Sequence, residues 1–127
     1  MNVVINSQSP VAMYRQIVDQ IIQNLAAGQL APGDQLPSIR SLSTELRINP
    51  NTVIKAYREL ELRGFAESRH GKGFFAADGS AKQARDDWRV RARDEIRDAV
   101  TRAVKLGMKS TEIMDIVEAI ISEGGSK

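Results

Sequence analysis

The chain of 127 residues contains no cysteine, so it can form neither a disulfide bond nor a thiolate metal site. This absence fits a reducing compartment. No apolar run approaches the roughly 18 residues of a membrane-spanning helix, and the N-terminus does not combine a basic segment with an apolar one. We therefore expect a soluble, cytoplasmic protein without a membrane contact.

Residues with catalytic chemistry are also few. His70 is the single histidine, and the acidic residues are scattered over charged segments. The sequence shows no nucleophile paired with a base and no cluster with metal-ligand spacing. An enzyme is therefore the least favoured class, and we expect no catalytic residue, no metal and no cofactor.

The excess of positive charge is small. The chain has 18 basic and 16 acidic residues, a formal net charge of +2. Residues 1–77 hold eight basic and six acidic side chains, whereas residues 78–127 hold ten of each. A nucleic-acid surface would therefore depend on the placement of a few cations rather than on bulk charge. A hydrophobic content of 42% is sufficient for a core, and the length fits one small domain with an appendage.

The most informative stretch is residues 49–60, which predicts a helix with a sharply defined start. Asn49 can accept hydrogen bonds from the first free backbone N–H groups, and Pro50 would occupy the first helical position, where its missing N–H costs nothing. Gly64 is placed to end the helix.

The two faces of this predicted helix differ at 100° per residue. The buried face would consist of Val53, Ala56, Tyr57 and Leu60. The opposite face would consist of Asn51, Lys55 and Arg58, flanked by Thr52 and Glu59. Long donors near a helix N-terminus suit a helix lying in a DNA major groove. An ordinary solvated amphipathic helix would show the same pattern, so the neighbouring segments decide between the two.

Two further helices are expected before this stretch. Residues 11–27 carry an apolar stripe at helical spacing, opened by Ser9 or Pro10 and closed by Gly28. The stripe consists of Tyr14, Ile17, Val18, Ile21, Ile22 and Leu25. Residues 38–46 predict a short helix with Ser38 as its N-cap. Because only residues 47–49 separate it from the next helix, the pair predicts a helix-turn-helix.

Residues 65–77 predict a β-hairpin that reverses at residues 70–73. A hairpin with a basic tip directly after a recognition helix is typical of a wing, which reaches the minor groove or the phosphates. Standing alone, the same residues would be a plain surface turn. At the N-terminus, residues 3–5 predict either a brief edge strand or an arm that packs on the domain.

After a small polar junction at residues 78–82, two helices are expected at residues 82–106 and 111–122, the second capped by Ser110. Two such helices cannot bury two apolar stripes by themselves, so they must pack on the first domain, on a second subunit or on both, and we favour a homodimer. The expected dimer interface consists of Trp88, Ala92, Ile96, Val100, Val104, Ile113, Ile116, Val117 and Ile120. The predicted fold is mainly α with a small β-hairpin: a winged helix-turn-helix domain over residues 1–77 and a two-helix dimerisation region over residues 78–127.

Three motifs carry a family resemblance. Residues 32–38 read Pro-Gly-Asp-Gln-Leu-Pro-Ser, residues 49–53 read Asn-Pro-Asn-Thr-Val, and residues 70–73 read His-Gly-Lys-Gly. In this order they resemble the GntR family of bacterial transcription regulators. The short two-helix tail and the Asn-x-Asn-Thr-Val motif are similar to the YtrA-type subgroup, whose compact C-terminal helices serve dimerisation.

The resemblance implies a set of DNA contacts. It implies that Arg40 reaches bases, such as guanine O6 and N7. It places Asn51, Thr52 and Lys55 in the major groove, Ser38 and Asn49 at phosphates, and Arg69, His70, Gly71 and Lys72 in the wing contact. Helix geometry alone adds Arg58. The alternatives are a surface ion pair for Arg40, a partner at Glu59 or Glu61 for Arg58, and a turn residue without a charge role for His70.

The sequence also departs from the family pattern. Pro50 and Ile54 stand where many relatives carry arginines, so the base-reading roles of those arginines cannot be transferred. The resulting hypothesis is a dimeric repressor that binds a double-stranded inverted-repeat operator. The resemblance implies control of a transporter operon. Regulation would act through a small-molecule effector at the C-terminal interface or through partner proteins. The alternative is a winged-helix protein-interaction module without specific DNA binding, which should expose apolar residues on the outer face of residues 49–60.

Overall fold

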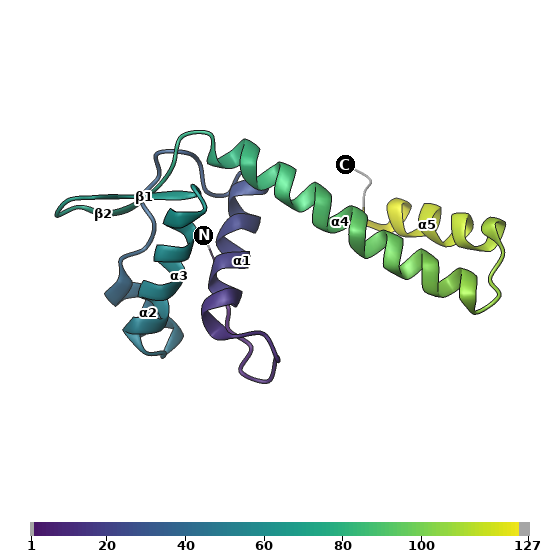
Figure 1. Cartoon of the computed structure of the whole chain (residues 1–127), viewed down its shortest axis with the longest axis horizontal. Coiled ribbons are helices and arrows are strands. Elements are labelled where there is room, and N and C mark those ends of the chain that lie inside the picture. The colour runs from purple at the N-terminus through teal and green to yellow at the C-terminus, as the bar shows by residue number, and fades with distance from the viewer. Residues whose placement is uncertain (1, 125–127) are drawn as a thin grey trace. The chain divides into compact units, whose positions relative to one another are not determined.

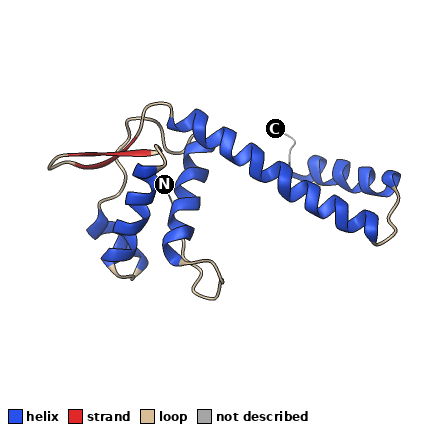
Figure 2. Cartoon of the chain, viewed as in Figure 1, coloured by secondary structure: helices blue, strands red, loops and turns tan. Residues whose placement is uncertain are grey.

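The computed structural model describes residues 2–124, which form helices and one antiparallel hairpin (Figures 1 and 2). The elements are α1 (Met13–Ala26), α2 (Ile39–Leu46), α3 (Pro50–Leu62), β1 (Ala66–Arg69), β2 (Gly73–Ala76), α4 (Ser80–Lys105) and α5 (Ser110–Gly124). The prediction of a mainly α fold with a small hairpin is confirmed. No helix in residues 2–124 has the length and apolar character to cross a membrane.

The chain divides into two compact units, residues 1–88 and 89–127, and α4 contributes to both. The first unit therefore continues beyond the junction at residues 78–82. Ser80 and Ala84 are fully buried in it, and Trp88 packs against its core. These residues recur every four positions, so one face of the first turns of α4 covers the core.

Local chemistry sets the starts of α2 and α3. The Ser38 hydroxyl accepts a hydrogen bond of 3.0 Å from the Ser41 N–H, and the Asn49 side-chain oxygen accepts one of 2.8 Å from the Asn51 N–H. Both predicted caps are confirmed. Gly64 adopts a φ of +84° just beyond the end of α3, a conformation that glycine accepts without steric cost.

The predicted start of α1 is wrong. The helix begins at Met13, and its N-cap, Ala12, offers no side-chain hydrogen bond. The Ser9 hydroxyl instead accepts a hydrogen bond of 3.1 Å from the Val11 N–H, so it stabilises the turn before the helix.

The N-terminal residues form an arm, the second of the two alternatives. Val3 is buried in the core, and two glutamines of α1 hold the arm backbone. The Gln20 side-chain oxygen accepts from the Val4 N–H at 2.8 Å, and that of Gln16 accepts from the Asn6 N–H at 2.8 Å. The amide side chains thus replace the strand partner that an edge strand would need.

The core of the first unit lies between α1 and α3. The predicted inner face of α3 is confirmed, because Val53, Ala56, Tyr57 and Leu60 are all fully buried. The apolar stripe of α1 is buried except at Tyr14, which is half-buried. Leu30 and Leu36 enter this core from the loop between α1 and α2.

A tight turn joins α2 to α3. Arg47 ends α2 in the left-handed conformation, with φ 58° and ψ 47°, and the Ile48 N–H donates to the Ser43 carbonyl at 3.1 Å. A residue with a side chain adopts this conformation at some steric cost. The turn leaves room for only residues 47–49 between the two helices, as the sequence predicts.

Tyr57 connects three parts of the first unit. Its ring is fully buried, and its hydroxyl donates a hydrogen bond of 2.7 Å to the Pro37 carbonyl, just before α2. Its ring also meets the Phe74 ring of β2 edge to face, with centroids 5.2 Å apart. Burial raises the pKa of Tyr57 because the charged phenolate would lose its hydration. One side chain of α3 therefore fixes the approach to α2 and the position of the wing.

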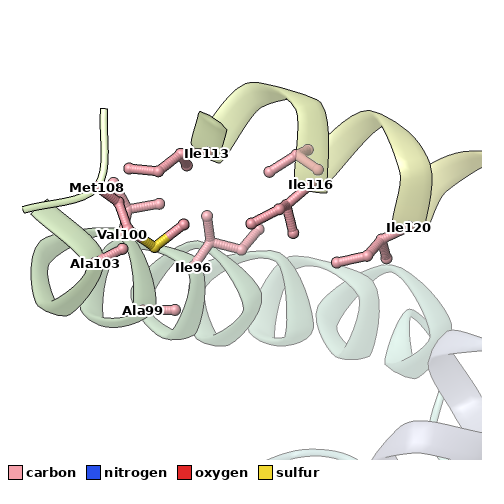
Figure 3. A pocket seen from close by; sticks show the side chains of 9 residues that line it. Ile96, Ala99, Val100, Ala103, Met108, Ile113, Ile116 and Ile120 are labelled. Carbon is pink, nitrogen blue, oxygen red and sulfur yellow. The ribbon is translucent and has the colours of Figure 1, made fainter. Parts of the chain in front are cut away.

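The second unit differs because its described residues, 89–124, form no buried core of their own. α4 and α5 face each other across an apolar groove of about 270 Å³. The groove is lined by Ile96, Ala99, Val100, Ala103, Met108, Ile113, Ile116, Val117 and Ile120. Figure 3 shows Ile113, Ile116 and Ile120 of α5 directed toward α4. Even so, Ile96 is 61% exposed, Ile116 47% and Ile120 58%.

We predict that Tyr57→Phe lowers the free energy of unfolding by about 1–2 kcal/mol, because the Pro37 carbonyl loses its donor. The raised pKa adds a pH dependence. Above about pH 10 an unfolded tyrosine releases its proton while the folded one keeps it, so wild-type stability should fall as pH rises. Urea denaturation at pH 7 and pH 10.5 tests both effects. Equal losses in wild type and Tyr57→Phe between the two pH values would contradict the pKa argument.

Candidate nucleic-acid interface

The outer face of α3 is accessible and, up to Arg58, polar; beyond it Leu62, in the last turn, is 86% exposed. Asn51, Lys55 and Arg58 are exposed, and Thr52 is partly exposed. Because the inner face of the same helix is fully buried, these side chains can only point away from the core. The cap at Asn49 also leaves α3 with a defined N-terminal end close to Asn51 and Thr52.

Arg40 lies on α2, the helix that packs beside α3, and its side chain is exposed. Within residues 2–124, neither Arg40 nor Arg58 forms an ion pair, so the alternatives with a carboxylate partner do not apply there. Glu61 instead accepts a hydrogen bond of 2.8 Å from the Ser68 hydroxyl of β1. Both guanidinium groups are therefore available to an external acceptor.

The wing is the β1–β2 hairpin, paired in register from Ala66 with Ala76 to Arg69 with Gly73. Its tip, residues 70–72, is exposed and carries His70 and Lys72. The Arg69 side chain has partners within the wing: its Nε lies 3.2 Å from a Glu67 carboxylate oxygen, and its Cζ lies 4.1 Å from the Phe75 ring centroid. A DNA phosphate would have to compete with Glu67 for this guanidinium.

A loop segment that the sequence did not reveal supports the wing. Residues 33–36 run along β2, where the Gly33 and Leu36 N–H groups donate to the Ala76 and Phe74 carbonyls at 2.8 and 2.9 Å. The Gln35 side chain donates to the Lys72 carbonyl at 2.7 Å. The wing tip is therefore braced from the loop that leads into α2. Proline and glycine around this segment hide the alternating pattern by which a strand is recognised.

Tyr14 is a second residue that the sequence did not bring to the site. It was expected only in the apolar stripe of α1, but the Lys55 ammonium lies 4.2 Å from its ring centroid. The two side chains border a surface hollow lined by Met13, Tyr14, Asn49, Asn51, Thr52 and Lys55. The sequence feature that could have identified Tyr14 is its place as an aromatic residue at the accessible end of the otherwise buried apolar stripe of α1.

The fold and this surface define a winged helix-turn-helix protein, with α2 and α3 as the helix pair and β1–β2 as the wing. Residues 13–76 match the bacterial regulatory proteins of the gntR family. The chain belongs to this family, so it is a DNA-binding transcriptional regulator rather than an enzyme.

Two relatives and one solved structure match this chain along almost their whole length. The HTH-type transcriptional regulator YhcF of Bacillus subtilis is 34% identical over 127 residues, covering 93% of this chain and 96% of that protein. The HTH-type transcriptional repressor YtrA of the same organism is 30% identical over 125 residues, covering 97% and 96%. A transcriptional regulator from Oenococcus oeni has a solved structure with a TM-score of 0.76 and 35% identity, covering 93% and 96%. The resemblance to short, YtrA-type members is confirmed.

We predict that Gly73→Ala destabilises the first unit by about 1–2 kcal/mol, because its φ of +104° is unfavourable for a residue with a side chain. The added Cβ would also lie 3.2 Å from the Gln35 Nε2 that braces the wing tip. Gly71→Ala is the matched control, since its φ is +71° and a Cβ there meets no atom within 4 Å. Urea denaturation should show a clearly larger loss for Gly73→Ala. Equal losses would show that the contact with Gln35 adds nothing to the cost of Gly73→Ala.

Proposed function

We propose that this regulator is a repressor that binds an inverted-repeat operator as a homodimer. α3 would lie in the major groove, with Asn51, Thr52 and Lys55 at base edges and Arg40 of α2 beside them. The wing tip would reach the flanking backbone or minor groove through Arg69, His70, Gly71 and Lys72. Phosphate contacts would come from Ser38 and Asn49 at the starts of the two helices. We add Arg58 from its position on the outer face.

The observation that carries this proposal is the contrast between the two faces of α3. The inner face is completely buried, whereas the outer face presents polar or cationic side chains at Asn51, Lys55 and Arg58, and its one exposed leucine, Leu62, lies in the last turn, away from the N-terminal end. A protein-docking surface would instead need an exposed apolar centre. This contrast favours DNA over the alternative of a protein-interaction module.

The apolar groove between α4 and α5 supports a second copy of the chain as its partner. Isoleucine and valine side chains exposed in such a continuous strip favour burial against a matching surface. In a dimer with twofold symmetry each copy offers the same strip, which would place two recognition helices on one operator. The proposed interface consists of Ala92, Ile96, Val100, Val104, Ile113, Ile116, Val117 and Ile120, extended by Ala99, Ala103 and Met108.

We leave Trp88, which we expected in the dimer interface from the sequence, out of this proposal. Its indole is partly buried against the core of the first unit, on the same face of α4 as Ser80 and Ala84. The apolar spacing along α4 is continuous through Trp88. Periodicity alone therefore does not show that Trp88 packs on the first unit while the later apolar residues of α4 line the groove.

The same groove bears on regulation. A small-molecule effector site usually combines an apolar pocket of roughly 300–1,000 Å³ with a few polar groups that orient the ligand. The groove is near the lower limit of that range, and its lining residues are all apolar. We therefore favour a partner chain over an effector as its occupant. Control of a transporter operon rests only on the resemblance to the YtrA-type group.

We predict that Lys55→Ala and Arg40→Ala each weaken binding to the operator by about tenfold or more, since a base contact contributes about 1–3 kcal/mol. Lys109→Ala removes the same charge at a position outside the proposed DNA contacts, so it serves as the control for Lys55→Ala. Gel shifts with DNA from upstream of the gene test this. No shift at low salt, or equal binding to scrambled DNA, would reject the regulator's proposed operator binding. Dissociation of the dimer by either variant would show that the assignment of faces is wrong.

We also predict that Ile116→Glu converts the dimer to a monomer, because the introduced carboxylate would be buried without a partner. Thr111→Glu adds the same charge in the first turn of α5, outside the groove, and should remain dimeric. Sedimentation velocity distinguishes the species, and circular dichroism checks that both variants keep their helices. A monomeric wild-type protein would overturn the dimer proposal.

A further inference from the structure

The contact between Lys55 and Tyr14 joins the outer face of α3 to α1. The Lys55 ammonium lies 4.2 Å from the Tyr14 ring centroid, and the Arg15 guanidinium carbon lies 5.5 Å from the same centroid. The Tyr14 ring is itself half-buried and packed against the core. A ring that the core holds in place therefore lies beside a cation on the proposed reading surface.

This geometry bears on the conformational freedom of the lysine. A lysine on an exposed helix face has many rotamers, and fixing one of them against DNA costs conformational entropy. An ammonium over an aromatic face is attracted by the electrons of the ring, which favours one orientation before DNA arrives. The ammonium has three N–H donors, so donors remain for an acceptor on DNA while the ring stays beside it.

We propose that Tyr14 is a positioning residue for DNA recognition: its ring holds the Lys55 ammonium in the orientation in which it enters the major groove. This inference rests on the proposed operator binding and adds α1 to the elements that set it. The tyrosine contributes through the electron density of its ring, and it acts through Lys55 rather than through its own hydroxyl.

A series of substitutions at position 14 tests this role at nearly constant side-chain shape. Tyr14→Phe keeps the ring, whereas phenylalanines with one, two and three ring fluorines weaken its attraction for a cation stepwise. Operator affinity measured by fluorescence anisotropy should stay within about twofold for Phe and fall about two- to fivefold by the trifluoro variant. In a Lys55→Ala background the same series should be flat.

Three outcomes would overturn the proposal. A loss that appears fully at Tyr14→Phe and does not change with fluorination would assign the effect to the hydroxyl. Binding that strengthens with fluorination would show that the ring restrains Lys55 away from DNA. A parallel loss in the Lys55→Ala background would show that the ring acts without the lysine.

A measurement without DNA separates this inference from the operator proposal. The ε-methylene protons of Lys55 should resonate upfield in the free protein because of the Tyr14 ring current, and Tyr14→Leu should abolish that shift. An absent shift would reject the contact even if the operator is bound. If the shift is present but the unmodified protein binds no selected DNA, operator binding fails, and the positioning role fails with it.

Discussion

The buried Tyr57 ring is the constraint on which the rest of the first unit depends. Its hydroxyl holds the Pro37 carbonyl before α2, and its ring meets Phe74 of the wing. Because Tyr57 shares the inner face of α3 with Val53, Ala56 and Leu60, the same burial turns the polar face outward. One side chain therefore links the orientation of α3 to the position of the wing.

The proposed DNA surface carries few cationic side chains. A net charge of +2 gives little general attraction to nucleic acid, so affinity would depend on a few cations at defined places. Two of these cations have intramolecular partners: Lys55 lies over Tyr14, and Arg69 pairs with Glu67 and stacks on Phe75. Partners of this kind restrict side-chain motion, which lowers the entropy lost on binding. For Arg69, the carboxylate partner also competes with phosphate.

Local chemistry made much of the fold predictable. Asn49, Pro50 and Gly64 define α3 through interactions within a few residues, and helical periodicity was enough to assign its faces. Contacts between distant segments could not be predicted in this way. The Gln35 side chain donates a hydrogen bond to the wing tip, 37 positions away in the chain, and no sequence pattern predicts this contact. Trp88 likewise continues an apolar spacing but packs on the first unit, because periodicity identifies a face without identifying its partner.

We propose that α3, α2 and the wing together read an inverted repeat as a symmetric pair. Selection of bound sequences from a random pool of double-stranded DNA tests it most directly, because the enriched sequences report specificity, symmetry and half-site spacing together. We expect two inverted half-sites whose centres lie one helical turn, about 10 base pairs, or a small multiple apart, and loss of enrichment with Lys55→Ala. Failure to enrich any sequence, or enrichment of a single unsymmetrical site, would contradict it.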